Sequence, residues 1–214
     1  MSLLTTNEPK TIDLLHETMH YKTIDEIYEG NSKIREQLKN LLAEVKAENL
    51  SALRDGEKWT VAQIVEHIAM VDEGTVRICA KLLRKAKDAG RTGDGKVTIS
   101  DQFLKKGSEL SDVKVEAPAF VRPTGEQTLA DSLARLDATE TQAAKLRELF
   151  RTVDSSEFKF PHPFFGDISA QEWLLLKGSH EMRHIRQIEE LLARIKQKGS
   201  GHEEGLMTET LRPS

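Results

Sequence analysis

Four long segments of the sequence carry apolar residues at the 3.6-residue spacing of an amphipathic α-helix. They run from about Ser32 to Leu50, Thr60 to Lys87, Glu126 to Val153 and Ser169 to Lys196. A helix with one apolar stripe must bury that stripe against another element, and four such helices can do so by packing together. The sequence therefore predicts an all-α protein that folds as an antiparallel four-helix bundle.

Pairs of polar residues three positions apart mark several of the expected helix starts. In such a capping box, each side chain accepts a hydrogen bond from the backbone N–H of the other residue. Three pairs fit this pattern: Thr23 with Glu26, Thr60 with Gln63, and Ser169 with Glu172. The second and third pairs predict helix starts at residues 60 and 169, and the first pair allows the first helix to begin before Ser32.

The connection between the second and third helices, from about Ala89 to Gly125, is long and contains several glycines and prolines. Its length predicts a crossover along the bundle, with short β-like pieces such as KVTI, and loops of this kind are often functional. The next link, DSSEFKFPHPFFGD, is rich in aromatic residues and is expected to pack against the end of the bundle. We expect residues 1–27 to form an N-terminal extension, 28–197 the bundle domain, and 198–214 a flexible tail.

The composition excludes several functional classes. The chain has 31 basic and 35 acidic residues, which are intermixed, so nucleic-acid binding has no electrostatic support. No apolar run reaches the length that would cross a membrane, and the single cysteine, Cys79, rules out an internal disulfide framework. We therefore expect a cytoplasmic protein that binds neither nucleic acid nor membrane.

The sequence HEMRH at residues 180–184 matches H-E-x-x-H, the helix signature of zinc proteases. His180 and His184 are four residues apart, so they share one face of the helix, and this face is the apolar one. Two buried imidazoles need partners, which either a shared metal ion or hydrogen bonds to backbone and water would supply. The residues after His184 offer no third ligand at the spacing of a protease, so we expect Glu181 to pair with a neighbouring helix.

A third histidine, His67, lies beside the apolar stripe of the second helix. Gly74 follows on the same side about two turns later, where it either leaves room for an open pocket or only eases helix packing. Three histidines from two helices suit Zn²⁺, Ni²⁺ or Fe²⁺ and leave one coordination position open. We therefore predict that His67, His180 and His184 bind a divalent metal.

The other histidines and the cysteine are weaker candidates. His16 and His20 belong to HETMH, a second match to the protease pattern, but this short segment has no partner. His162 lies in a loop, where we expect a structural role, and His202 lies in the tail and is given no role. Cys79 lies on an apolar stripe and is predicted to be a small buried residue.

Two stretches resemble a known family. The stretch WTVAQIVEHIAMVDE (59–73) places His-Ile seven residues after a helix-starting threonine. The stretch HPFFGDISAQEWLLLKGSHEMRHIRQI (162–188) joins a His-Pro-x-x-Gly loop to Trp, His-x-x-x-His and a later Gln. Over about residues 28–196 the chain resembles the DinB superfamily, specifically its bacillithiol-transferase-like branch. The resemblance implies a four-helix bundle that binds a divalent metal through His67, His180 and His184, and a homodimer.

Characterised relatives in this family include metal-dependent transferases of low-molecular-weight thiols and a mycothiol-dependent isomerase. The resemblance therefore implies an S-transferase that moves such a thiol onto an electrophilic small molecule, with the metal holding the thiol as thiolate. Two alternatives stay open: a metal-dependent hydrolase on the same site, and a non-catalytic metal-binding stress protein. Lys177 departs from the apolar pattern of the inward arc, and we expect it either to snorkel to solvent or to reach an anionic substrate.

Overall fold

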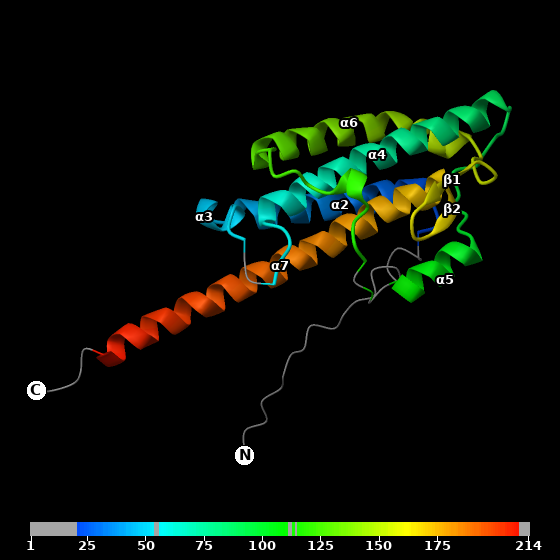
Figure 1. Ribbon diagram of the computed structural model, residues 1–214. Coiled ribbons are helices and arrows are strands. Elements are labelled where there is room, and N and C mark those ends of the chain that lie inside the picture. The colour runs from blue at the N-terminus through cyan, green and yellow to red at the C-terminus, as the bar shows by residue number, and fades with distance from the viewer. Residues whose placement is uncertain (1–20, 54–55, 111–112, 114, 210–214) are drawn as a thin grey trace, which may run out of the picture.

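Four long helices pack side by side in the computed structural model, which describes residues 21–53, 56–110, 113 and 115–209 (Figure 1). The long helices are α2 (Ile24–Ala43), α4 (Val61–Asp88), α6 (Leu129–Thr152) and α7 (Ala170–Glu209). The shorter elements are α3 (Ala47–Leu50), α5 (Asp101–Leu110), a 3-10 helix (Ala119–Val121), and strands β1 (Lys159–His162) and β2 (Gly166–Ser169). The predicted four-helix bundle is confirmed.

The helix starts follow the predicted capping boxes. The hydroxyl of Thr23 accepts a hydrogen bond from the backbone N–H of Glu26 at 3.3 Å, and equivalent boxes form at residues 60 and 169. Helix α2 therefore begins before Ser32 and inside the segment that we expected to be an N-terminal extension. It ends at Ala43, and the residues that were expected to continue it form the separate helix α3.

Helices α4 and α6 run in the same direction, as two contacts along the pair show. Nε of Arg135 donates to Oε2 of Glu73 at 2.6 Å, and Gly93 N, just past the end of α4, donates to Thr152 O at the end of α6 at 2.9 Å. Helix α7, in contrast, runs antiparallel to α4 (Figure 1). Parallel neighbours cannot be joined by a tight turn, so the chain needs the long crossover that the sequence predicted.

The crossover is more ordered than the loop with β-like pieces that the sequence suggested. The KVTI piece forms only an isolated bridge, at Lys96, and the chain then enters helix α5. The hydroxyl of Ser100 accepts from Phe103 N at 3.3 Å and donates to Glu172 at the start of α7 at 2.5 Å. Phe103 is buried against Phe165, with ring centroids 5.0 Å apart, so α5 attaches the crossover to the end of the bundle.

The link between α6 and α7 forms a β-hairpin of strands β1 and β2, which the sequence analysis did not predict. Gly166 begins β2 with a positive φ of 74°, a conformation that glycine adopts without strain. The indole of Trp173 donates to Phe160 O at 3.4 Å, and Phe165 is buried in the core. The aromatic link therefore packs against the bundle end, as expected.

Helix α7 extends to Glu209, well past the predicted end near Lys196. The segment 198–214, which we expected to be a flexible tail, is therefore helical as far as Glu209. The HETMH segment at residues 16–20 lies outside the described residues.

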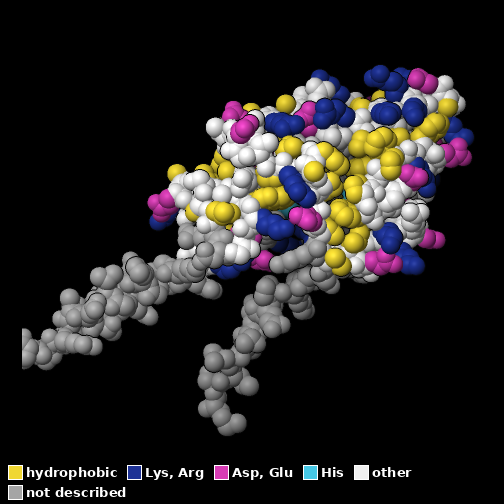
Figure 2. Space-filling model, in the orientation of Figure 1, with side chains coloured by type: hydrophobic (Ala, Val, Ile, Leu, Met, Phe, Trp, Pro, Cys, Tyr) yellow, Lys and Arg dark blue, Asp and Glu magenta, His cyan; other side chains and the backbone are white. Residues whose placement is uncertain are grey.

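The surface carries charges of both signs. On the face shown in Figure 2, basic and acidic side chains are interspersed with apolar ones. Within the described part of the chain, no helix is both long and apolar enough to cross a bilayer.

Candidate metal centre

The structure brings together the three histidines that the sequence singled out. His67 comes from α4, and His180 and His184 come from α7. Nε2 of His180 lies 3.1 Å from Nε2 of His67 and 3.1 Å from Nε2 of His184, and one ligand atom from each residue lies within 4.8 Å of the other two. Two imidazoles bound to one ion at about 2.0–2.1 Å place their nitrogens roughly 3.0–3.4 Å apart, so the spacing suits a shared metal.

Hydrogen bonds at the opposite ring nitrogens fix two of the three rings. Nδ1 of His67 lies 2.7 Å from the carbonyl of Val121, and Nδ1 of His184 lies 2.8 Å from Oε1 of Gln187. Both partners are oxygen acceptors, so both Nδ1 atoms carry the proton and both Nε2 atoms keep a lone pair. Nδ1 of His180 is buried without a hydrogen-bond partner among the residues that the structure describes.

The donor set fits a cation better than it fits hydrogen bonding alone. Two of the Nε2 atoms are acceptors, and a neutral His180 can donate one proton to only one of them. An imidazolium is disfavoured: burial lowers the pKa of His67, burial and the neighbouring histidines hold the pKa of His180 well below its usual range, and burial lowers the pKa of His184 to about 3. A divalent cation, in contrast, accepts all three lone pairs.

The far end of the crossover forms one wall of this site. The carboxylate of Glu66, next to His67, accepts hydrogen bonds from Thr124 N at 2.9 Å, Thr124 Oγ1 at 2.8 Å and Gly125 N at 2.9 Å. These bonds hold the segment in which Val121 offers its carbonyl to His67. Trp59 packs against His67 on another side, with ring centroids 4.9 Å apart.

Sequence reasoning missed the contribution of Val121, because a backbone carbonyl leaves no signal in the side-chain pattern. Gln187 is part of the sequence pattern shared with the family, but no role was predicted for it. In the structure, its side-chain oxygen is the hydrogen-bond partner of Nδ1 of His184.

The glutamate of HEMRH does not face the histidine cluster. Glu181 is fully buried, and its two oxygens accept hydrogen bonds from Arg35 of α2 at 2.6 and 2.8 Å. It pairs with a neighbouring helix, as predicted. A glutamate held in this way is not available as the general base that a zinc protease requires.

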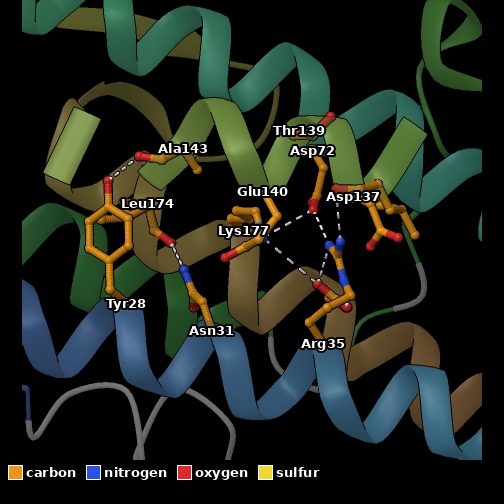
Figure 3. Close-up of polar contacts among 12 residues, drawn as sticks. Tyr28, Asn31, Arg35, Asp72, Asp137, Thr139, Glu140, Ala143, Leu174 and Lys177 are labelled. Atoms are coloured by element: carbon orange, nitrogen blue, oxygen red, sulfur yellow. Dashed lines mark hydrogen bonds and ion pairs between the residues drawn. The ribbon is translucent and has the colours of Figure 1, made fainter. Parts of the chain in front are cut away.

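Lys177 follows neither of the two expectations for it. Its side chain neither snorkels to solvent nor remains free for a substrate, since it is buried in the bundle centre (Figure 3). Its ammonium lies 3.1 Å from Asp72 and 3.4 Å from Glu140. Lys177 is therefore part of an internal ion network.

The remaining candidates have structural roles. Nδ1 of His162 accepts hydrogen bonds from the backbone N–H groups of Phe164 and Phe165, and burial lowers the pKa of His162 to about 4. Cys79 is buried as predicted, and burial raises its pKa to about 12. His16 and His20 lie outside the described residues, as does the side chain of His202.

Gly74 does not ease helix packing. A Cβ built on this residue would meet nothing within 4 Å, so its position faces open space. At Gly178 of α7, in contrast, an added Cβ would lie 2.1 Å from Oδ1 of Asn31 on α2. The close approach of two helices therefore depends on Gly178, which the sequence analysis did not single out.

One comparison identifies the family of this chain, and two others find similar proteins. The family model of the DinB superfamily matches residues 31–188. The uncharacterized protein YuaE of Bacillus subtilis is 23% identical over 159 residues, which cover 73% of this chain and 91% of YuaE.

Two solved structures share the fold. One is TT2238, described as a four-helix bundle protein, with a TM-score of 0.52, 25% identity and coverage of 78% of this chain and 98% of TT2238. The other is YfiT from Bacillus subtilis, described as a probable metal-dependent hydrolase with an unusual four-helix bundle topology. YfiT has a TM-score of 0.51 and 24% identity, with coverage of 81% of this chain and 87% of YfiT. Since the family model spans most of the chain, the protein belongs to the DinB superfamily.

Proposed function

We propose that this protein is a divalent-metal-dependent enzyme that transfers a low-molecular-weight thiol to an electrophilic small molecule. The observation that carries the proposal is the convergence of His67, His180 and His184, with Nε2 contacts of 3.1 Å. Three neutral ligands leave the full charge of a divalent ion uncompensated and one position open, which favours an anionic fourth ligand.

A bound Zn²⁺, Ni²⁺ or Fe²⁺ would supply the chemistry of the site by lowering the pKa of a thiol in the open position, so that the thiol is present as thiolate at neutral pH. The residues of the chain then have two tasks. Val121 and Gln187 keep the proton of each ring on Nδ1, and so direct Nε2 of His67 and His184 toward the site. Trp59 shields one side of His67 from water.

Two carboxylates adjacent to the ligands in sequence favour a thiol over water as the nucleophile. Glu66 is bonded to the crossover, and Glu181 is bonded to Arg35, so neither is free to take a proton from water. The pKa of a free thiol is about 8.5 and that of water is about 15.7, so a thiol on the metal would release its proton to solvent at neutral pH without either carboxylate, whereas the pKa of a bound water would fall only to about 7.

A metal-dependent hydrolase is the second candidate, and it is supported by the description of YfiT as a probable metal-dependent hydrolase. A non-catalytic metal-binding stress protein is the third. The substrate in either catalytic case is a small molecule, and we propose that the protein acts as a homodimer in the cytoplasm.

The proposal can be tested by measuring metal content and activity together. The protein is purified without added metal, loaded with Zn²⁺, Ni²⁺ or Fe²⁺, and assayed with a panel of thiols against a generic electrophile. We expect about one metal per chain and turnover that requires a thiol. His67→Ala should lose both, whereas His162→Asn, which changes a half-buried histidine outside the cluster, should retain both.

Each alternative predicts a different result. Metal-dependent turnover without any thiol would support the hydrolase, and bound metal without turnover would support the binding protein. Full metal content in His67→Ala would show that the site is assigned to the wrong residues.

A further inference from the structure

A buried arginine connects α2 to the three other long helices. Nε and Nη2 of Arg35 donate to the two oxygens of Glu181 on α7 at 2.6 and 2.8 Å, and Nη2 also donates to Asp72 on α4 at 2.5 Å. Nη1 donates to the carbonyl of Leu136 on α6 at 3.3 Å. Figure 3 shows the guanidinium in the interior of the bundle, where only 5% of Arg35 and none of Asp72 or Glu181 is exposed.

The two carboxylates that Arg35 binds lie beside the metal ligands in sequence. Glu181 directly follows His180 on α7, and Asp72 comes little more than one turn after His67 on α4. The histidines project toward the candidate metal centre, while the carboxylates of the same turns project toward Arg35. The ion pairs therefore join α4 and α7 at the same level of the bundle as the histidine cluster.

Lys177 supports this arrangement but does not duplicate it. Its ammonium lies 3.1 Å from Asp72, 3.4 Å from Glu140 and 3.9 Å from Glu181. An ammonium is a point charge that can rotate among these partners, whereas a guanidinium in a two-bond contact has a fixed orientation. Arg35, rather than Lys177, is thus the group whose bonds fix the distance and relative orientation of the carboxylates of Glu181 and Asp72.

We propose that Arg35 is a positioning residue for the metal centre, because it sets the rotation and spacing of α4 and α7, the helices that carry the three histidines. The inference rests on the proposed metal site. Arg35 itself does not contact the histidine cluster; it acts through Glu181 and Asp72. Groups bonded directly to a metal ligand change metal affinity by about 10–100-fold when they are replaced, and Arg35 acts from one residue further away, so we expect an effect at the low end of this range, about tenfold.

The test must separate loss of positioning from loss of stability. Removal of Arg35 alone would leave two buried carboxylates poorly compensated, and the bundle could unfold for that reason. The double variant Arg35→Met, Glu181→Met removes both partners of the main ion pair, replaces them with apolar side chains, and leaves Asp72 paired with Lys177. A second variant, Arg35→Lys, keeps the charge but cannot reproduce the two-bond contact.

The control is Asn31→Ala, on the same helix about one turn earlier. Nδ2 of Asn31 donates to Leu174 O at 3.0 Å, so the variant removes a buried hydrogen bond between α2 and α7 without changing the ion pairs. Co²⁺ titrations followed by absorption spectroscopy are carried out on each protein where it is shown to be folded, and metal-free crystal structures are determined for the wild type and the variants. Both positioning variants should bind Co²⁺ about tenfold more weakly with an altered spectrum, while Asn31→Ala should match the wild type.

Two results would overturn the inference. One is wild-type Co²⁺ affinity and spectrum in the double variant, or in Arg35→Lys if the double variant does not fold. The other is a metal-free variant structure in which the three Nε2 atoms keep the spacing of the wild type. If Co²⁺ binding to the wild type does not depend on His67, the proposed function fails, and the metal-free structures still decide whether Arg35 positions the histidines.

Discussion

At the scale of single residues, burial holds several histidines of this bundle in the neutral form. His162 is useful for measuring this effect because it lies outside the histidine cluster and accepts defined hydrogen bonds in the hairpin. Its Nδ1 accepts two backbone hydrogen bonds, which a protonated ring could no longer accept. Protonation of this ring would therefore break both hydrogen bonds, so the stability of the bundle end depends on pH.

We predict that stability falls as the pH is lowered from 7 to 5, partly through His162. Its pKa is about 4 in the folded protein and 6.5 in its ordinary range, so the unfolded chain takes up the proton first. The stabilisation is fully present above pH 6.5 and is lost progressively toward pH 4. His162→Asn keeps an acceptor but does not titrate, so its free energy of unfolding should fall by about 1–2 kcal/mol less than that of the wild type.

Urea denaturation of the two metal-free proteins at pH 7 and pH 5 measures this difference. The buried histidines of the cluster titrate in both proteins and so cancel. Equal losses of stability in the two proteins would contradict the assignment to His162.

At the scale of elements, the spacing between two helices depends on whether a glycine lies at the point where they approach each other. Gly178 lets α7 approach α2, whereas Gly74 of α4 faces open space. Both residues lie inside helices, where alanine is intrinsically favoured over glycine by up to about 1 kcal/mol. The two sites therefore form a matched pair with opposite expectations.

We predict that Gly74→Ala stabilises the protein by about 0.5–1 kcal/mol and that Gly178→Ala destabilises it by about 1–3 kcal/mol. The added methyl at residue 178 would collide with Asn31, whose amide is already bonded to Leu174 O. Thermal and urea unfolding of both variants check the prediction. A destabilised Gly74→Ala variant would show that this glycine does have a packing role.

The crossover allows a second prediction at this scale. Glu66→Gln leaves one oxygen to accept the three hydrogen bonds from Thr124 and Gly125, so the segment that presents the Val121 carbonyl should loosen. We expect a loss of about 1–3 kcal/mol of stability and weaker metal binding, measured by calorimetric titration. Thr128→Ala, which removes the cap of α6, should cost about 1 kcal/mol but leave the metal affinity unchanged.

The sequence predicted those helices whose sequence patterns lie within the helix itself. Capping boxes and apolar stripes lie within a few residues of one another, so the starts of α4 and α7 could be read directly. Helix α5 could not, because its start depends on the contact of Ser100 with Glu172 and its burial on Phe165, both far along the chain. The hairpin of β1 and β2 could not be predicted for a similar reason: its aromatic residues are stabilised by contacts with the end of the bundle, which the local sequence does not show.

At the scale of the whole molecule, the candidate site combines predictable and unpredictable parts. Helical spacing placed His180 and His184 on one face and His67 beside the apolar stripe of the second helix, and the family resemblance pointed to the same three residues. The partners of Glu181 and Lys177 could not be predicted, because no local pattern shows which charges will meet in the interior of a bundle. The carbonyl of Val121 was equally hidden, as it depends on the path of the crossover.

We predict that a bound metal stabilises the entire bundle. An ion that binds only the folded protein adds about 2.7 kcal/mol at a concentration one hundred times its Kd, which corresponds to a rise in Tm of roughly 5–10 °C for a chain of this size. Zn²⁺ should produce this rise in the wild type but not in His67→Ala, as measured by differential scanning calorimetry. Mg²⁺, which prefers oxygen ligands, serves as the control, and an equal shift with Mg²⁺ would indicate non-specific binding.

The order of the helices has a consequence for how the protein is made. His67 and His180 are separated by 113 positions, with the crossover, α6 and the hairpin between them. Contacts between such distant residues form late, because a long loop must close before they are made. A nascent chain that has completed only its first three long helices lacks two of the three ligands. An ion bound by the proposed trio would therefore be captured only after α7 has docked, and its uptake would report that α7 is in place.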